Sequence, residues 1–233
     1  MRMKGRNLQK IISELEDLYG EPKPPKVTSP YEMILFEAIA YLVTDETRER
    51  TYDSLYERVG TGPVQILEAP LATMQDILKP GGMNPDGRLE KLRTTALTYL
   101  QEFHGSFAET LKQPLPKAKK AFMKFPGIGE PGAEKILLFS RTYPLLAPDS
   151  NGLRALRRIG YGKDDKNYST CYRSIREDTK DELIEDYDWL IKAHQLLRQH
   201  GQQMCKRKDP FCGSCPFTKI CSAFIEDRLS PLF

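Results

Sequence analysis

The chain has 233 residues, of which 39% are hydrophobic and 29% charged, and its formal net charge is only +3. No apolar run approaches the roughly 20 residues that a membrane-spanning helix needs, and the length suits one large core or two modest ones. Such a small net charge does not by itself indicate that the protein binds nucleic acid. A basic surface, if there is one, has to be formed by local clusters of basic residues. We expect a soluble, intracellular protein.

Apolar residues recur with helical spacing nearly everywhere, and no segment alternates convincingly with a period of two. The predicted fold is therefore all-α. The opening residues carry charges inside their apolar stretch, which is typical of an amphipathic helix rather than a targeting peptide. Proline and glycine separate the segments. The predicted helices span residues 5–19, 30–43, 46–59, 70–78, 87–103, 117–124, 131–142, 150–159, 167–177 and 181–199.

A short turn motif, Phe-Pro-Gly-Ile-Gly at residues 125–129, lies between two predicted helices. Gly127 and Gly129 permit a tight turn whose backbone N–H groups no side chain screens, and the next helix adds its positive N-terminal dipole. Such a turn binds a phosphate without reading sequence. A plain connection between two helices is the alternative reading.

Basic residues gather in three places, and acidic residues collect elsewhere, between positions 177 and 188. This separation of sign predicts one basic face, although each group also fits an ordinary solvated surface. The three groups are Lys117, Lys119, Lys120 and Lys124, then Arg154, Arg157 and Arg158, and finally Lys206, Arg207 and Lys208.

Four cysteines near the end of the chain, Cys205, Cys212, Cys215 and Cys221, follow the pattern C-x6-C-x2-C-x5-C. Thiolates ligate zinc and iron–sulfur clusters, and four so close together share one centre only if the chain winds tightly round it. Structural zinc sites more usually show two separated C-x2-C pairs, so the spacing favours a [4Fe–4S] cluster over zinc. Disulfides are disfavoured because no secretory signal opens the chain and a fifth cysteine, Cys171, is left over, which we expect to be buried.

Three motifs now combine: FPGIGEPGAEKILL at 125–138, APDSNGLRALRR at 147–158, and the four cysteines. In this order and with these separations they resemble the helix-hairpin-helix DNA glycosylases of the endonuclease-III-like type. The likeness extends upstream to SPYEMILFEAIAYLVTDE at 29–46 and PGGMNPDGRLEKL at 80–92, so it covers most of the chain.

The resemblance implies two all-α domains with DNA in the cleft between them. Residues 27–143 would form a helical barrel that carries the hairpin, and residues 1–26 with 144–233 an iron–sulfur cluster domain. The implied reaction is hydrolysis of the N-glycosidic bond of a nucleotide flipped from the duplex. The implied partner is double-stranded DNA with a damaged or mismatched base. The protein is then expected to be a monomer located with the DNA, in the cytoplasm or otherwise inside the cell.

Asp149 matches the catalytic aspartate of this family. A fixed carboxylate stabilises the oxocarbenium character that develops on the deoxyribose. The alternative is that Asp149 is only the N-cap of the helix that follows it, although the two roles are compatible. Strand-cleaving members carry a nucleophilic lysine two residues after the second hairpin glycine, where this chain has Pro131. The resemblance therefore implies a monofunctional enzyme that leaves an abasic site. Lys135, one turn later and about 6 Å further along the helix, is the alternative nucleophile.

Glu37 falls where adenine and thymine mismatch glycosylases resemble one another in carrying a catalytic glutamate. Its neighbours in the sequence are apolar. Burying a carboxylate among them is energetically unfavourable unless it faces a cleft or has a partner. Burial would raise its pKa and suit Glu37 to protonate a leaving base. The alternative is a glutamate on the polar face of an amphipathic helix. The adenine glycosylases also carry a further domain for 8-oxoguanine, which disfavours that substrate here, because the sequence ends soon after Cys221.

The residues that contact DNA also follow from the resemblance. Tyr41, Leu42 and Met83 are candidates for stacking on the flipped base or filling its place in the duplex, and we expect at least one of them to be core. Phosphate contacts are expected from the hairpin residues Lys124, Pro126, Gly127, Ile128 and Gly129 and from Lys206, Arg207 and Lys208 in the cysteine loop. The cluster itself is expected to be structural.

Two other interpretations stay open at this point. A strand-cleaving lyase would use another lysine in place of the missing one, and a non-catalytic, cluster-containing DNA-binding protein would need neither Asp149 nor Glu37. The sequence does not name the excised base.

Overall fold

The structure is a computed structural model that describes residues 6–163 and 165–226. It confirms the all-α prediction, because the described residues form helices and no strand. The chain divides into two compact units, which we call the hairpin unit, Pro25–Thr142, and the cysteine unit, Met1–Pro24 with Tyr143–Phe233. In the described part of the chain, no helix is long and apolar enough to cross a membrane.

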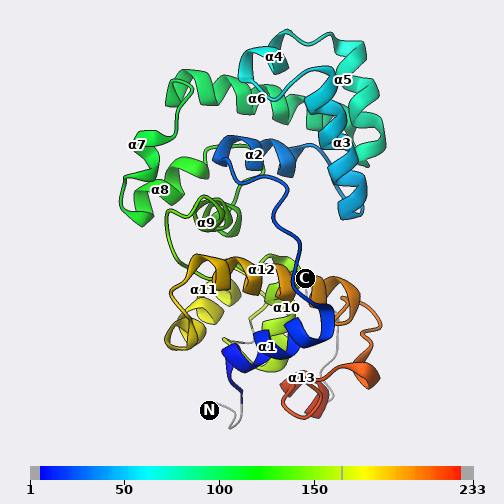
Figure 1. Cartoon of the computed structure of the whole chain (residues 1–233), viewed down its shortest axis with the longest axis vertical. Coiled ribbons are helices and arrows are strands. Elements are labelled where there is room, and N and C mark those ends of the chain that lie inside the picture. Colours follow the sequence, from blue (N-terminus) through cyan, green and yellow to red (C-terminus); the bar gives the residue numbers. More distant parts are fainter. Residues whose placement is uncertain (1–5, 164, 227–233) are drawn as a thin grey trace. The chain divides into compact units, whose positions relative to one another are not determined.

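The hairpin unit consists of consecutive helices joined by short loops (Figure 1). They are α2 (Pro30–Ala38), α3 (Asp45–Arg58), α4 (Pro63–Glu68), α5 (Leu71–Leu78), η1 (Lys79–Gly81), α6 (Pro85–Phe103), α7 (Ala108–Leu111), α8 (Leu115–Phe122) and α9 (Glu130–Phe139). The cysteine unit combines α1 (Leu8–Tyr19) with α10 (Ser150–Ile159), α11 (Tyr168–Thr179), η2 (Lys180–Glu182), α12 (Tyr187–Gln203), η3 (Cys212–Ser214) and α13 (Ser222–Ile225).

The helices predicted at 30–43 and 181–199 differ most from the structure, each for a local reason. The helix predicted at 30–43 ends at Ala38, because the chain then turns to let the Tyr41 N–H donate to the Gly81 carbonyl at 2.9 Å. The helix predicted at 181–199 begins at Tyr187, since the Asp186 side chain caps it by accepting from the Trp189 N–H. Helices α4, α7 and α13 were not predicted, being too short for a periodic pattern. Residue 5 of the predicted helix 5–19 lies outside the described residues.

A chain of aromatic rings holds the hairpin unit together. Tyr31 of α2 stacks on Tyr99 of α6 with ring centroids 4.2 Å apart, and Tyr99 packs against Phe107 at 4.8 Å. Phe107 in turn contacts Phe122 of α8 at 4.8 Å and Phe125 at 5.6 Å. Phe125 directly precedes the hairpin turn and is only 2% exposed. Because its ring is buried, the start of the turn is fixed to the core.

A buried ion cluster joins the two helices of the hairpin. Lys119 of α8 donates to Glu130 at 2.7 Å and to Glu134 at 2.8 Å, both on α9. The Glu134 side chain is fully buried, and that of Lys119 is 19% exposed. Buried carboxylates keep their charge only when paired and hydrogen-bonded. Lys119 therefore fixes how α9 leaves the turn.

Replacing Lys119 with methionine is expected to lower the free energy of unfolding by about 3 kcal/mol, because it removes the ammonium that pairs with the buried Glu134 carboxylate. Urea denaturation measures the change. The control is Lys120→Met, which removes the same charge from an exposed neighbour and is expected to cost less than about 0.5 kcal/mol. Equal losses in the two variants would mean that the cluster does not stabilise the hairpin.

The same cluster predicts a pH dependence. Burial lowers the pKa of Lys119, but its hydrogen bonds to Glu130 and Glu134 outweigh burial and leave the pKa raised above 10.5. A raised lysine pKa contributes stability that is present below pH 10.5 and is lost as the pH rises further. The difference in stability between wild type and Lys119→Met is therefore expected to shrink only at strongly alkaline pH.

In the cysteine unit, α10 packs against α12 and is buried along its whole described length apart from its first turn. The burial includes Arg154, Arg157 and Arg158, which are 6%, 8% and 1% exposed. The prediction that these three arginines belong to a solvated basic face was wrong. Their burial means that hydrogen bonds within the protein must satisfy the guanidinium groups.

Candidate functional site

The hairpin turn has the geometry that its glycines predict. Gly127 adopts φ +85°, which favours glycine, and Gly129 is the N-cap of α9. Both glycines are exposed, whereas the Ile128 side chain is buried and its N–H donates to the Phe125 carbonyl at 3.1 Å. Lys124, beside the turn, is exposed and paired with Glu102 at 2.5 Å. The exposed backbone at the start of α9 suits a phosphate.

Pro131 stands at the second position of α9, where a missing N–H costs little. It offers no amine to a sugar carbon. Lys135 lies one turn further along α9, and its ammonium forms an ion pair with the Glu37 carboxylate of α2. The only alternative nucleophile named from the sequence is therefore held against a carboxylate in the same unit.

Glu37 lies in the last turn of α2, and its side chain is 38% exposed. Glu37 is therefore exposed rather than buried, and it pairs with Lys135 of α9. The backbone next to it is also fixed. Arg48 of α3 donates to the carbonyls of Phe36 at 2.9 Å and of Glu37 at 3.3 Å.

Tyr41, Leu42 and Met83 are 57%, 71% and 63% exposed, so the expectation that one of them belongs to the core was wrong. They lie on two loops that meet where the Tyr41 N–H donates to Gly81. Leu42 adopts φ 56°, a left-handed conformation that is unfavourable for leucine. A strained backbone at an exposed apolar residue such as Leu42 is more typical of a functional position than of packing.

Arg88 of α6, which the sequence did not single out, fixes these two loops. Its guanidinium is 3% exposed and donates to the carbonyls of Ile39, Leu78, Gly82 and Met83 at 2.7 to 2.9 Å. A Cβ on Gly81 would lie 2.4 Å from Arg88 Nη1, so only glycine fits beside it. No motif marks such a residue, because its partners are backbone carbonyls from segments far apart in the chain.

In the cysteine unit, Asp149 is the N-cap of α10. Its Oδ1 accepts the N–H groups of Asn151 at 2.9 Å and Gly152 at 2.8 Å, while Oδ2 accepts the Asn151 amide at 3.2 Å. Oδ2 also lies 3.4 Å from Nε of Arg198, on α12. The side chain is 27% exposed. Capping α10 therefore fixes the orientation of the Asp149 carboxylate, and part of this side chain remains accessible to solvent.

Two further residues near Asp149 were missed from the sequence, Arg198 and Tyr168. Burial, and then the charge of Asp149, raises the pKa of Tyr168 to about 12, so the phenol is protonated at neutral pH. Arg198 supplies a positive charge to the same carboxylate. Both lie on helices whose periodicity was recognised, but nothing in that periodicity distinguishes them from ordinary surface residues.

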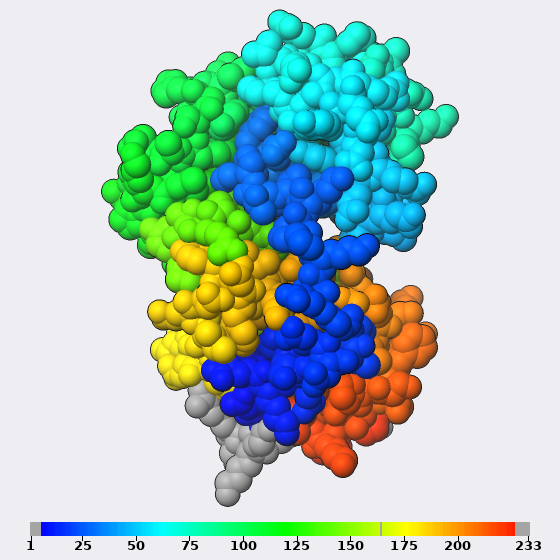
Figure 2. All heavy atoms as spheres, viewed as in Figure 1, coloured from blue at the N-terminus to red at the C-terminus, as the bar shows by residue number. Residues whose placement is uncertain are grey.

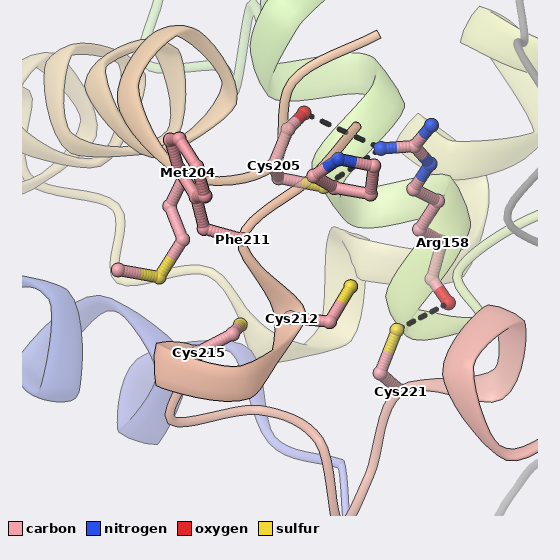
Figure 3. A pocket seen from close by; sticks show the side chains of 8 residues that line it. Arg158, Met204, Cys205, Phe211, Cys212, Cys215 and Cys221 are labelled. Atoms are coloured by element: carbon pink, nitrogen blue, oxygen red, sulfur yellow. Dashed lines mark hydrogen bonds between the residues drawn. The ribbon is translucent and has the colours of Figure 1, made fainter. Parts of the chain in front are cut away.

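The four cysteines of the C-terminal motif line one hollow, together with Arg158, Met204, Pro210 and Phe211 (Figure 3). The hollow encloses about 270 Å³, part of it open to solvent. All five cysteines of the chain are free thiols, so the disulfide alternative is wrong, and Cys171 is buried as predicted. The stretch around residue 210, orange in Figure 2, lies at the surface of the cysteine unit.

Two arginines of α10 hold the start of the cysteine loop. Arg158 donates to the carbonyl of Lys206 at 2.6 Å and to that of Arg207 at 3.2 Å, and it lies 3.5 Å from Cys205 Sγ. Arg154 donates to the Cys205 carbonyl at 3.0 Å. The helix that Asp149 caps therefore also positions the first cysteine. These contacts explain why Arg154 and Arg158 are buried rather than solvated.

His200 lies behind the cysteine loop. Its Nε2 is 3.8 Å from Cys215 Sγ, and its Nδ1 is 3.1 Å from the Tyr19 hydroxyl. Burial lowers the pKa of His200 to about 4, so the ring is neutral. A proton on Nε2 then suits donation to the sulfur. On the outer side of the loop, Arg207 and Lys208 are exposed, and Lys206 lies over the Phe211 ring at 4.5 Å.

The four thiols line one hollow and are of the residue type that ligates metal centres. Burial raises the pKa of Cys215 to about 11 and raises those of Cys212 and Cys221. A metal centre would supply the positive charge that keeps such sulfurs as thiolates.

Comparison with known proteins indicates which class of protein this chain resembles. No model of a known protein family matches the chain. Endonuclease III of Rickettsia conorii is 24% identical over 221 residues, which is 92% of this chain and 96% of the relative. Endonuclease III of Rickettsia felis is 29% identical over 221 residues, covering 92% and 95%.

Solved structures agree on the fold. A trapped endonuclease III–DNA covalent intermediate superposes with a TM-score of 0.73 at 18% identity, covering 96% of this chain and 99% of the other. A thermostable thymine-DNA glycosylase gives 0.63 at 18% identity, covering 94% and 97%. The relatives and the solved structures agree on one class, the helix-hairpin-helix DNA glycosylases, to which this chain is similar in sequence and in fold.

Proposed function

We propose that this protein is a base-excision DNA glycosylase of the monofunctional type, which hydrolyses the N-glycosidic bond and leaves the strand intact. The absence of strand cleavage in this proposal rests on the residues of helix α9, which follows the hairpin turn. Pro131 replaces the nucleophilic lysine, and the next lysine on that face, Lys135, is paired with Glu37. An amine attacks a sugar carbon only when it is neutral and free to approach.

Asp149 is the residue we propose for transition-state stabilisation. As the bond from C1′ to the base nitrogen breaks, positive charge develops on the deoxyribose, and a carboxylate fixed by four donors stabilises it without reorganising. Water then adds its oxygen to C1′, and its proton balances the charge on the released base. Oδ1 is committed to capping α10, so Oδ2 is the oxygen that faces the reaction.

Double-stranded DNA with a damaged or mismatched base is the proposed partner. The exposed N–H groups at Gly127 and Gly129 suit a phosphate oxygen, and Arg207 and Lys208 are exposed cations on the cysteine loop. Tyr41, Leu42 and Met83 are the proposed apolar contacts with the opened duplex, since their exposed side chains share one braced pair of loops.

Cys205, Cys212, Cys215 and Cys221 are proposed to hold a [4Fe–4S] cluster. It supplies no electron to a hydrolysis, so we assign it a structural role. What it organises is the loop 205–221, whose first residues are also held by Arg154 and Arg158.

The test is a panel of duplexes, each with one lesion or mismatch, whose strands are resolved with and without hot alkali. We expect strand breaks only after alkali, because an abasic site is alkali-labile while the enzyme itself does not cut. Borohydride is expected to trap no protein–DNA adduct. Breaks without alkali, with an adduct lost in Lys135→Ala, would establish a lyase instead. No excision from any duplex would leave a DNA-binding module.

A further inference from the structure

His200 contacts two of the four cysteines that line the hollow. It lies in the last turn of α12 and is 2% exposed. Its backbone carbonyl accepts the N–H of Cys205 at 2.8 Å, and its side-chain Nε2 lies 3.8 Å from Cys215 Sγ. One residue outside the motif therefore reaches both the first and the third cysteine.

The His200 ring is also held from its other side. Its Nδ1 lies 3.1 Å from the hydroxyl of Tyr19, the last residue of α1. The Phe217 ring meets the imidazole edge-on, with ring centroids 5.3 Å apart. Because α1 packs against α12 in the cysteine unit, Tyr19 reaches His200 although the two lie 181 positions apart in the sequence. Both ring nitrogens thus have partners within the protein.

The direction of these two hydrogen bonds follows from the chemistry of a metal-bound sulfur. A cysteine ligates a metal as the thiolate, which has no proton to give, so Nε2 has to be the donor to Cys215. Burial disfavours a charged imidazole, and the neutral ring has one donor and one acceptor nitrogen. Nδ1 is then the acceptor, and the Tyr19 hydroxyl donates to it. The hydroxyl thereby selects the tautomer that presents an N–H to the sulfur.

We propose that Tyr19 and His200 together raise the reduction potential of the metal centre, by placing this N–H on Cys215 Sγ. This role rests on the proposed [4Fe–4S] cluster, since the potential of such a cluster depends on hydrogen bonds to its sulfurs. A donor stabilises the reduced form, because that form carries more negative charge. Removing an electron is correspondingly harder, so the cluster resists oxidants. Tyr19 acts through His200 and is a positioning residue.

The experiment compares the purified, cluster-containing wild type with His200→Phe and Tyr19→Phe by voltammetry. His200→Phe is expected to shift the equilibrium between the two forms about tenfold toward the oxidised cluster, the effect of one hydrogen bond, which is about 59 mV for one electron. Tyr19→Phe keeps the ring and removes only the hydroxyl. It is expected to shift the equilibrium in the same direction by less, since His200 then populates both tautomers.

Ferricyanide gives a second measure that does not depend on a resolved voltammetric wave. It accepts one electron from the cluster and becomes ferrocyanide, and the fall in visible absorbance follows the decay of the oxidised cluster. Both variants are expected to lose the cluster faster than the wild type, and His200→Phe is expected to lose it fastest. Equal rates in all three proteins would contradict the proposed effect on the potential.

Further variants separate this role from a general loss of packing. Tyr19→Phe is expected to have no further effect in the His200→Phe background, because the hydroxyl acts through the imidazole. His200→Gln keeps an N–H donor and is expected to restore part of the potential. It also replaces His200→Phe in the comparison if the larger change prevents uptake of iron. Tyr161→Phe is the matched control, since it removes a buried hydroxyl of the same unit whose partner is Glu182 at 2.8 Å. We expect it to lower the melting temperature and to leave the potential unchanged.

The effect on the potential can fail while the cluster and the glycosylase stand. An unchanged potential and an unchanged rate of cluster loss in the His200 variants would overturn the proposed effect alone. An equal effect of Tyr19→Phe with and without His200 would show that Tyr19 does not act through the imidazole, and would overturn its positioning role. Wild-type protein that contains no iron would overturn the cluster and this effect together, whereas the duplex panel tests the glycosylase independently of both.

Discussion

Replacing Asp149 with asparagine is expected to slow base excision by about 10³-fold while duplex binding stays within a few-fold of wild type. Asparagine has nearly the same shape, and its carbonyl oxygen still accepts the N–H groups of Asn151 and Gly152, so α10 keeps its cap. What is lost is the negative charge facing the sugar. Single-turnover rates and fluorescence anisotropy with a labelled duplex measure the two quantities separately.

The chain offers a matched control in Asp186→Asn. Asp186 also caps a helix, accepting from the Trp189 N–H at 2.8 Å at the start of α12. The chemical change is identical, and stability is expected to change about as much in each variant. An equal effect of the two substitutions on excision would show that Asp149 matters only as a cap, and would favour a protein that binds DNA without acting on it.

The second large effect is expected from Cys215→Ala. We expect the wild type to contain about four iron atoms per chain and the variant to lose them, since each thiolate holds one iron. Binding of a structural metal centre is folding free energy, so the melting temperature of the cysteine unit is expected to fall by about 10 °C or more. Iron analysis, visible absorbance and thermal unfolding measure these changes.

Cys171→Ala is the control, because Cys171 is fully buried on α11 and does not line the hollow. It is expected to retain all its iron and to lose about 1 kcal/mol of stability from the missing sulfur. Wild-type protein with one zinc and no iron would contradict the proposed cluster. A Cys215→Ala variant that keeps its iron would remove Cys215 from the ligand set.

Local motifs were recognised from the sequence where the chemistry lies within a few neighbouring residues. The glycines of the hairpin turn and the capping Asp149 are of this kind, because a tight turn or a helix start needs particular residues at fixed offsets. The all-α fold followed from periodicity for the same reason. The four cysteines also line one hollow, as their spacing predicted.

Where the predictions from the sequence differ from the structure, the cause is a contact between segments that lie far apart in the chain. The apolar neighbours of Glu37 predicted that it faces a cleft or has a partner, but its partner Lys135 lies on another helix, and no local pattern identifies that residue. Arg154 and Arg158 looked like surface charges, yet carbonyls of the cysteine loop satisfy them. The helix predicted to continue past Ala38 ends there because the Tyr41 N–H finds the Gly81 carbonyl.

Arg88 has a consequence for how such a protein changes in evolution. It holds the two loops of Tyr41, Leu42 and Met83 entirely through backbone carbonyls, so the brace is indifferent to which side chains those loops display. Under the proposed function, substitutions at these exposed positions would change the contact with the opened duplex and leave the Arg88 hydrogen bonds in place. New lesion preferences would then be open to single mutations, whereas Gly81 and Arg88 depend on one another, because a Cβ on Gly81 would lie 2.4 Å from Arg88 Nη1.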